Sequence, residues 1–159
     1  RNEDSIIQAY FDHSRPRIDP IVCINILILS FRNGRGAELS ESLDWVFNIL
    51  QSRKYINGTY YEVTAECFLY FISGLISNMP NICSAMMESF GEAVRERFSM
   101  PGDGLTVSMR ILAAASVGLS DVSDISSLLK LQNQDGSIKR YMYKYGSTGM
   151  LIGNRGLAP

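Results

Sequence analysis

The sequence predicts an all-α fold of packed helical hairpins, and three observations carry this prediction. Apolar residues recur at helical spacing, several segments open on a capping residue, and pairs of helices repeat along the chain. No segment alternates polar and apolar residues for long enough to require a sheet. We therefore expect helix content well above half, no sheet beyond a short hairpin, and one domain of 159 residues.

The first expected helix spans Pro20 to Arg32. Asp19 is a capping residue placed directly before a proline, which suits the first helical position because its missing N–H is not needed there. Asn33 and Gly34 supply a C-cap. The many isoleucines also suit a buried strand, and periodicity does not separate the two, but the caps and the length favour a helix.

Five further helices are expected, each with its apolar residues on one face or with a capping residue at its start. A small-residue helix follows Asp103, and either Ser123 or Asp124 caps the last and shortest one. The segments are Leu39 to Gln51, Glu62 to Ser77, Pro80 to about Phe98, Gly104 to Val117 and a short helix ending at Leu131.

The helices repeat in pairs. Asp19, Glu62 and Asp103 open successive buried helices at intervals of 43 and then 41 residues, and a fourth start is suggested near Gly153 and Asn154. A two-helix repeat of this length is typical of helical-hairpin arrays. Open solenoids and closed toroids share it, so the repeat alone does not choose between them.

Composition excludes several classes of protein. A net charge of −1 gives no electrostatic basis for binding nucleic acid, and the longest apolar run, Ile21 to Phe31, is too short to span a bilayer. The three cysteines lack CxxC spacing, which argues against a disulfide framework or a zinc site. The lone histidine, His13, is expected to be a surface residue. We expect a reduced, cytoplasmic protein.

The C-terminal part carries a family resemblance. The segment from Leu129 to Ser137 resembles the Gln-Trp motif of squalene and oxidosqualene cyclases. The aromatic residue that should follow the glycine is absent, and Ile138 and then Tyr141 occur instead. The segments Tyr143 to Ser147 and Gly153 to Leu157, together with Tyr10 to Pro20 and Tyr61 to Leu69, are similar to proteins of the terpenoid-cyclase/protein-prenyltransferase superfamily. The resemblance implies that the chain is about half, the C-terminal half, of an α/α toroid.

In such a toroid the inner helices point their N-terminal ends toward the mouth of a central cavity. The resemblance therefore implies that acids at these ends surround an apolar pocket, with Glu66 and Asp103 as catalytic candidates. Helix capping explains Asp103 equally well. Arg110, on an otherwise apolar helix, must find a partner if it is buried, and Asp103 or Glu66 is the expected one. The candidate substrate-binding residues are Tyr60, Glu62, Tyr70, Arg110, Tyr145 and Arg155.

The protonating and metal-binding motifs of the superfamily are missing. Asp121 and Asp124 have the wrong spacing for a DxDD motif, no DDxxD motif occurs, and the zinc ligands of protein prenyltransferases are absent. We expect no cofactor, except magnesium if a diphosphate is bound. We also expect the isolated chain to turn over no prenyl diphosphate.

Two functions remain open from the sequence. The first is the C-terminal half of a class II terpene-cyclase-like protein, which binds an isoprenoid or another apolar ligand in its cavity. The alternative is a non-catalytic helical-repeat module that binds a protein partner. In either case the apolar helix from Pro20 to Arg32 needs cover. That cover is expected from a missing N-terminal half or from self-association, unless the segment Asn2 to Arg17 folds back over it.

Overall fold

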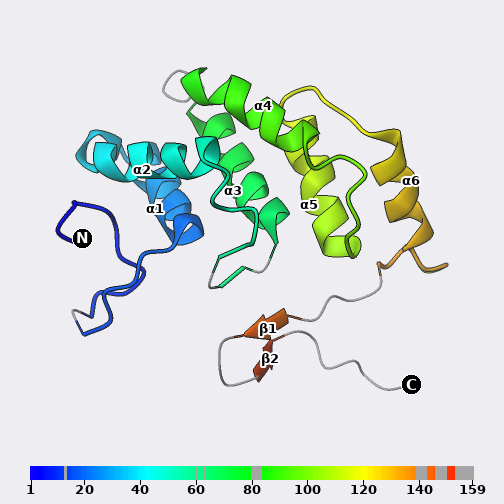
Figure 1. The fold of residues 1–159 in the computed structure, drawn as a ribbon, viewed down its shortest axis with the longest axis horizontal. Coiled ribbons are helices and arrows are strands. Elements are labelled where there is room, and N and C mark those ends of the chain that lie inside the picture. Colours follow the sequence, from blue (N-terminus) through cyan, green and yellow to red (C-terminus); the bar gives the residue numbers. More distant parts are fainter. Residues whose placement is uncertain are drawn as a thin grey trace.

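The computed structural model describes residues 1–12, 14–59, 61–62, 64–79 and 84–138, and the backbone of 143–145 and 150–152. Within these residues the fold is all-α, as predicted, with one short two-stranded hairpin (Figure 1). Helices occupy about half of the described residues, which is less than expected because several of them are shorter than their apolar patterns.

Six α-helices form three successive hairpins. They are α1 (Pro20–Arg32), α2 (Ser40–Gln51), α3 (Ala65–Asn78), α4 (Met87–Arg95), α5 (Gly104–Ala115) and α6 (Val122–Lys130). Two 3-10 helices, η1 (Gly36–Leu39) and η2 (Ser84–Met86), precede α2 and α4. The strands β1 (Tyr143–Tyr145) and β2 (Met150–Ile152) pair antiparallel, with Lys144 opposite Leu151.

The odd-numbered helices run side by side in the order α1, α3, α5, and all three begin at the same end of the molecule (Figure 1). Each even-numbered helix packs on the odd-numbered helix before it, and α2 also packs on α4. We call α1, α3 and α5 the inner helices and α2, α4 and α6 the outer helices. The hairpin repeat predicted from the sequence is thus present, and the fourth helix start near Asn154 lies outside the described residues.

The first helix has the predicted bounds. Asp19 caps α1 by accepting hydrogen bonds from the N–H groups of Ile21 and Val22, and Asn33 closes the helix. These signals are local in the sequence, which explains why they could be recognised in advance.

Three other helix starts were predicted wrongly. α3 begins at Ala65 rather than at Glu62, because Thr64 caps it through the N–H of Cys67 while Glu62 lies in the preceding turn. α4 covers only Met87–Arg95, less than half of the expected segment, whose first residue Pro80 lies outside the described residues. α6 is capped by Asp121 and not by Ser123 or Asp124.

The core lies between the inner and outer helices. Its largest fully buried apolar side chains come from four helices and the loop after α2: Ile24, Leu27, Leu50, Tyr55, Phe68, Leu69, Ile72, Leu75 and Phe90. Burying each such side chain stabilises the fold by about 1.5–3 kcal/mol. This core fixes the relative positions of the inner helices, on which the candidate site depends.

The N-terminal segment folds back over the start of this array. Ile6 and Ile7 are buried, and the backbone N–H of Ile7 donates to the hydroxyl of Ser42 on α2 at 3.1 Å. The thiol of Cys23 donates to the carbonyl of Ile7 at 3.3 Å, and Phe11 remains exposed. The segment therefore covers part of α1, as the alternative in the sequence analysis anticipated, and self-association of the chain stays a prediction.

Candidate functional site

Acidic residues stand at the N-terminal ends of the three inner helices, as predicted. Two of them are caps. Asp19 is buried and holds the first turn of α1, whereas Asp103 is exposed and accepts a hydrogen bond from the N–H of Thr106 at 2.9 Å. The carboxylates of these two residues are therefore engaged by backbone N–H groups of their own helices.

The third acid, Glu66 in the first turn of α3, is buried in an ion-pair cluster. Its Oε1 accepts hydrogen bonds from Nε of Arg97 at 2.9 Å and from Nη1 of Arg110 at 3.0 Å. The side chains of Glu66 and Arg110 are each 1% exposed. The expected pairing of Arg110 with Glu66 is confirmed, and Asp103 is not the partner of this arginine.

Asp124 on α6 is the second partner of Arg110. Nε and Nη2 of the guanidinium donate to the two carboxylate oxygens at 2.7 and 2.6 Å, and Nη2 also donates to the carbonyl of Met100 at 2.6 Å. Burial alone would lower the pKa of Arg110, but the bonds and charges of Asp124 and Glu66 outweigh it and raise the pKa above its ordinary value. The arginine therefore stays charged in the interior.

The ion-pair cluster of Glu66, Arg97, Arg110 and Asp124 is electrically balanced, because two carboxylates face two guanidinium groups. Its members come from α3, the turn after α4, α5 and α6, so the cluster joins the second hairpin to the third. Burying charge in this way is tolerated only when every charge is paired. The arrangement holds Glu66, in the first turn of α3, and Arg110, near the middle of α5, in fixed positions.

Arg97 and Asp124 had not been recognised as part of this site from the sequence. A buried arginine in α5 signals that acids must surround it, but which acids do so depends on how α6 and the turn after α4 pack against α5. No residue next to Asp124 in the sequence signals this role.

The remaining predicted site residues lie apart from the ion-pair cluster or outside the residues that the structure describes. The backbone of Glu62 closes a turn with Thr59, and its side chain is half-buried. Tyr70 is exposed on α3 and its ring stands edge-on to that of Phe71, with centroids 5.5 Å apart. Tyr145 belongs to β1, but its side chain is not described, and Tyr60 and Arg155 lie outside the described residues.

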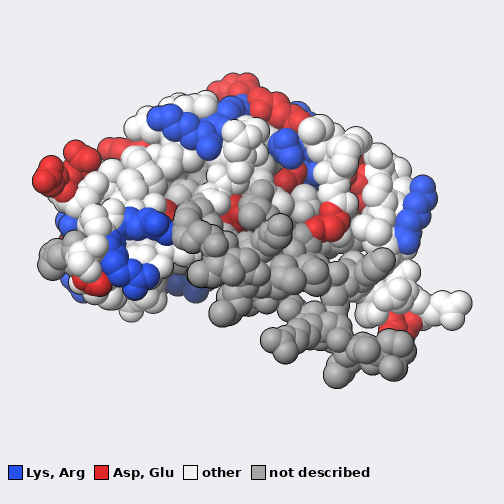
Figure 2. All heavy atoms as spheres, turned by 60° about the horizontal axis from the view of Figure 1, so that its bottom comes forward, with Lys and Arg blue, Asp and Glu red and all other residues white. Residues whose placement is uncertain are grey.

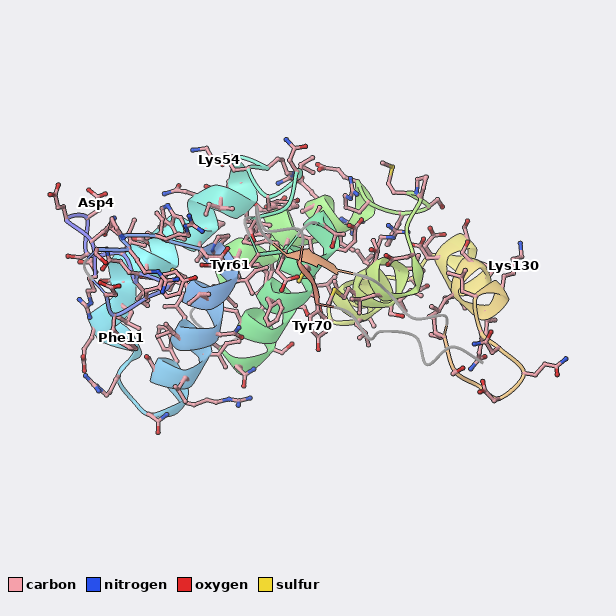
Figure 3. The ribbon with its side chains drawn as sticks, turned by 90° about the horizontal axis from the view of Figure 1, so that it is seen from below. Asp4, Phe11, Lys54, Tyr61, Tyr70 and Lys130 are labelled. Atoms are coloured by element: carbon pink, nitrogen blue, oxygen red, sulfur yellow. The ribbon has the colours of Figure 1, made fainter. Side chains whose placement is uncertain are left out.

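The inner helices also carry an apolar surface that the outer helices leave uncovered. Some of the exposed and half-buried apolar positions on each inner helix are spaced by about one turn or are adjacent in sequence. We call this set, in which Ile26 and Phe71 also pack against the core, the inner face: Val22, Ile26 and Leu29 on α1, Tyr70 and Phe71 on α3, and Leu105, Met109 and Leu112 on α5. Figure 3 shows Tyr70 on the side of α3 opposite to Lys54, which follows α2. Arg32 donates to Asn78 at 2.8 Å and bridges the far ends of α1 and α3.

The charge distribution is mixed on the side of the molecule that Figure 2 presents. Figure 2 shows acidic and basic side chains interspersed over the described part of the face that it presents, with no large area of one sign. Within the described residues no three His, Cys, Asp or Glu side chains gather as they would around a metal ion. Nor does any helix in that part of the chain have both the length and the apolar character needed to cross a membrane.

A known protein family and a known protein are similar in sequence to this chain. The family model of the sesquiterpene cyclase astC-like C-terminal domain matches residues 1–33. Drimenol cyclase drtB of Aspergillus calidoustus is 39% identical over 161 residues, an alignment that covers 99% of this chain and 30% of that protein. No solved structure matches significantly. The two similarities, one of which runs along almost the whole chain, support a terpene-cyclase-like family for it.

Proposed function

We propose that this chain forms one wall of an apolar cavity in which a terpene-cyclase-like protein folds and cyclises a prenyl chain. The observation that carries the proposal is the inner face, because it places apolar side chains in contact with solvent on three adjacent helices. Large exposed apolar surfaces mark binding sites rather than ordinary protein surface. The chain spans only 30% of the length of its drimenol cyclase relative, so the opposite wall is assigned to the rest of the protein.

The inner face suits the chemistry that a sesquiterpene cyclase carries out. Aliphatic side chains such as Leu29 and Leu112 exclude water from a growing carbocation, which would otherwise be quenched. The aromatic faces of Tyr70 and Phe71 attract positive charge at short range. In this proposal Glu66 and Arg110 keep α3 and α5 at a fixed spacing, and Asp103 holds the start of α5.

The proton that starts the reaction is assigned to a residue outside this chain. The described acids at the helix N-termini are engaged as caps or as partners of arginine. A diphosphate-bearing substrate usually brings magnesium with it. Since the described residues contain no group of metal-ligating side chains, we assign magnesium binding to the rest of the protein as well.

One observation favours the second function, a module that binds a protein partner. The outer helix α6 exposes Val122, Ile125 and Leu129, which are spaced as an apolar stripe along one side of the helix. Amphipathic helices use such stripes to dock on other proteins. The cavity-wall function depends on the inner face, and the partner-binding function depends on the stripe on α6. One substitution on each surface therefore distinguishes the two functions.

The test uses two leucines with almost equal exposure. Leu29 on the inner face is 62% exposed and Leu129 on α6 is 63% exposed, so Leu29→Glu and Leu129→Glu introduce the same charge at similar cost to folding. In the complete gene product, Leu29→Glu is expected to lower kcat/KM for farnesyl diphosphate at least about tenfold, since a buried carboxylate opposes an apolar substrate. Leu129→Glu is expected to change it less than about twofold. An equal loss in both variants, or a loss in Leu129→Glu alone, would contradict the proposal.

A further inference from the structure

A second pocket lies at the start of the array, away from the inner face. It has a volume of about 290 Å³, is open to solvent on one side, and is lined by residues at the N-terminal end of α1, in the C-terminal half of α2 and in the loop at 54–59. It shares no residue with the inner face or with the ion-pair cluster. The pocket is therefore structurally separate from the proposed cavity wall.

The body of this pocket is apolar and aromatic. Trp45 and Ile49 on α2 form one side, and Ile18 and Pro20 at the start of α1 form the other. The ring of Tyr55 is stacked on Phe68, with centroids 4.7 Å apart and planes 14° from parallel, so this part of the lining is rigid. Small-molecule sites combine such an apolar lining with a few well-placed polar groups.

Two charged residues line the pocket, and they differ in whether their charge is already engaged. Asp19 is 2% exposed, and its carboxylate accepts the first N–H groups of α1, whose helix dipole offsets the negative charge. Lys54 is exposed, and its ammonium group forms no ion pair with any residue that the structure describes. The unengaged charge at the pocket is therefore positive.

We infer that this pocket binds a small amphipathic organic anion. The apolar body of the ligand packs against Trp45, Ile49 and Ile18, and its anionic group pairs with Lys54. The hydroxyl of Thr59, also in the lining, is placed to contribute a polar contact. Phosphate and carboxylate ligands share this chemistry, and a pocket of this size accepts one compact apolar group and not an extended lipid surface.

The single tryptophan of the chain makes occupancy of the pocket directly measurable. Because Trp45 lines the pocket and the chain contains 1 Trp, all tryptophan fluorescence of the chain comes from a residue of this site, and the lysine variants below test whether the probe binds there. The probes are 1-anilinonaphthalene-8-sulfonate and N-phenyl-1-naphthylamine, which share an aromatic body and differ in the sulfonate. Energy transfer from Trp45 to either probe is followed during titration of the 159-residue chain.

A matched pair of lysines tests the role of charge. Lys54→Met removes the ammonium group at the pocket, and Lys130→Met removes one from the exposed end of α6, at the opposite side of the molecule (Figure 3). We expect Lys54→Met to weaken binding of the sulfonate probe roughly fivefold and to leave the neutral probe within about twofold. Lys130→Met should change neither. Far-UV circular dichroism confirms that both variants are folded.

Competition by small organic anions provides a second test of the pocket. Displacement of the sulfonate probe by 1-naphthyl phosphate or by 1-naphthoate, which share one compact apolar group, supports the inference, and the better competitor tells whether phosphate or carboxylate is preferred. The inference is overturned if the sulfonate probe shows no energy transfer from Trp45. It is also overturned if Lys54→Met and Lys130→Met weaken binding equally, or if neither anion displaces the probe.

Discussion

Arg110 on α5 and Asp124 on α6 form a buried two-point ion pair, in which Nε and Nη2 of the arginine lie 2.7 and 2.6 Å from the two carboxylate oxygens. Glu66 takes a third donor of the same guanidinium, at 3.0 Å. One arginine therefore joins α3, α5 and α6, and its removal leaves the buried carboxylate of Asp124 without this partner.

Replacing Arg110 is expected to be among the most destabilising single changes in the chain. Arg110→Met leaves Glu66 with only Arg97 and leaves Asp124 without a cation among the described residues, which should lower the free energy of unfolding by about 3–5 kcal/mol. Urea denaturation followed by circular dichroism measures the change. Arg95→Met, on the exposed side of α4, is the control and should cost less than about 0.5 kcal/mol. Equal effects of the two substitutions would show that the cluster does not hold the hairpins together.

The hydroxyl of Tyr55 is buried and has no hydrogen-bond partner within the described structure. Tyr55→Phe removes an unsatisfied polar atom and keeps the ring that stacks on Phe68, so the free energy of unfolding should stay unchanged or rise by up to about 1 kcal/mol. Tyr61→Phe serves as the comparison, because the Tyr61 hydroxyl donates to that of Tyr10 and its loss should be destabilising. Marked destabilisation by Tyr55→Phe would mean that this hydroxyl has a partner in solution.

The same tyrosine predicts a pH dependence on the alkaline side. Burial raises the pKa of Tyr55 to about 12 from its ordinary value of 10.0. The folded state therefore keeps the phenolic proton between about pH 10 and 12 while the unfolded state loses it, and this contribution to stability is complete below pH 10 and disappears as the pH rises through 12. Stability should fall by about 2 kcal/mol more in the wild type than in Tyr55→Phe over that interval. Parallel pH profiles of the two proteins would contradict this assignment.

The isolated chain is expected to form no product from geranylgeranyl diphosphate or squalene, with or without magnesium. The physical reason is that its described N-terminal acids are committed, Asp19 and Asp103 to helix ends and Glu66 to two arginines. Gas chromatography of extracts after long incubation is the measurement. Formation of a product by the isolated chain would refute the expectation. If that product is not formed by the Glu66→Gln variant, the acid that initiates the reaction belongs to this chain.

The sequence predicted those parts of the structure that depend on neighbouring residues. The Asp19 cap and the bounds of α1 follow from side chains within one turn of each other. For Arg110 the need to neutralise a charge on an apolar helix predicted an acidic partner but left Asp103 and Glu66 open, and the tertiary packing selects Glu66. The start of α3 was misplaced because Glu62 and Thr64 are both acceptable near a helix start, and only the turn at Thr59 decides between them. Asp124 was expected only as one of two candidate caps of α6, since its distant partner on α5 leaves no local signal.

The central claim is that the inner face of α1, α3 and α5 contacts the prenyl chain, and photoaffinity labelling of the complete gene product tests it most directly. A farnesyl diphosphate analogue with a photoreactive group at its apolar end is bound, irradiated and mapped by mass spectrometry. The account predicts cross-links in the helical peptides that contain Leu29, Tyr70 and Leu112, which unlabelled farnesyl diphosphate suppresses. Suppressible labelling of α2, α4 or α6, with the inner helices unlabelled, would contradict it.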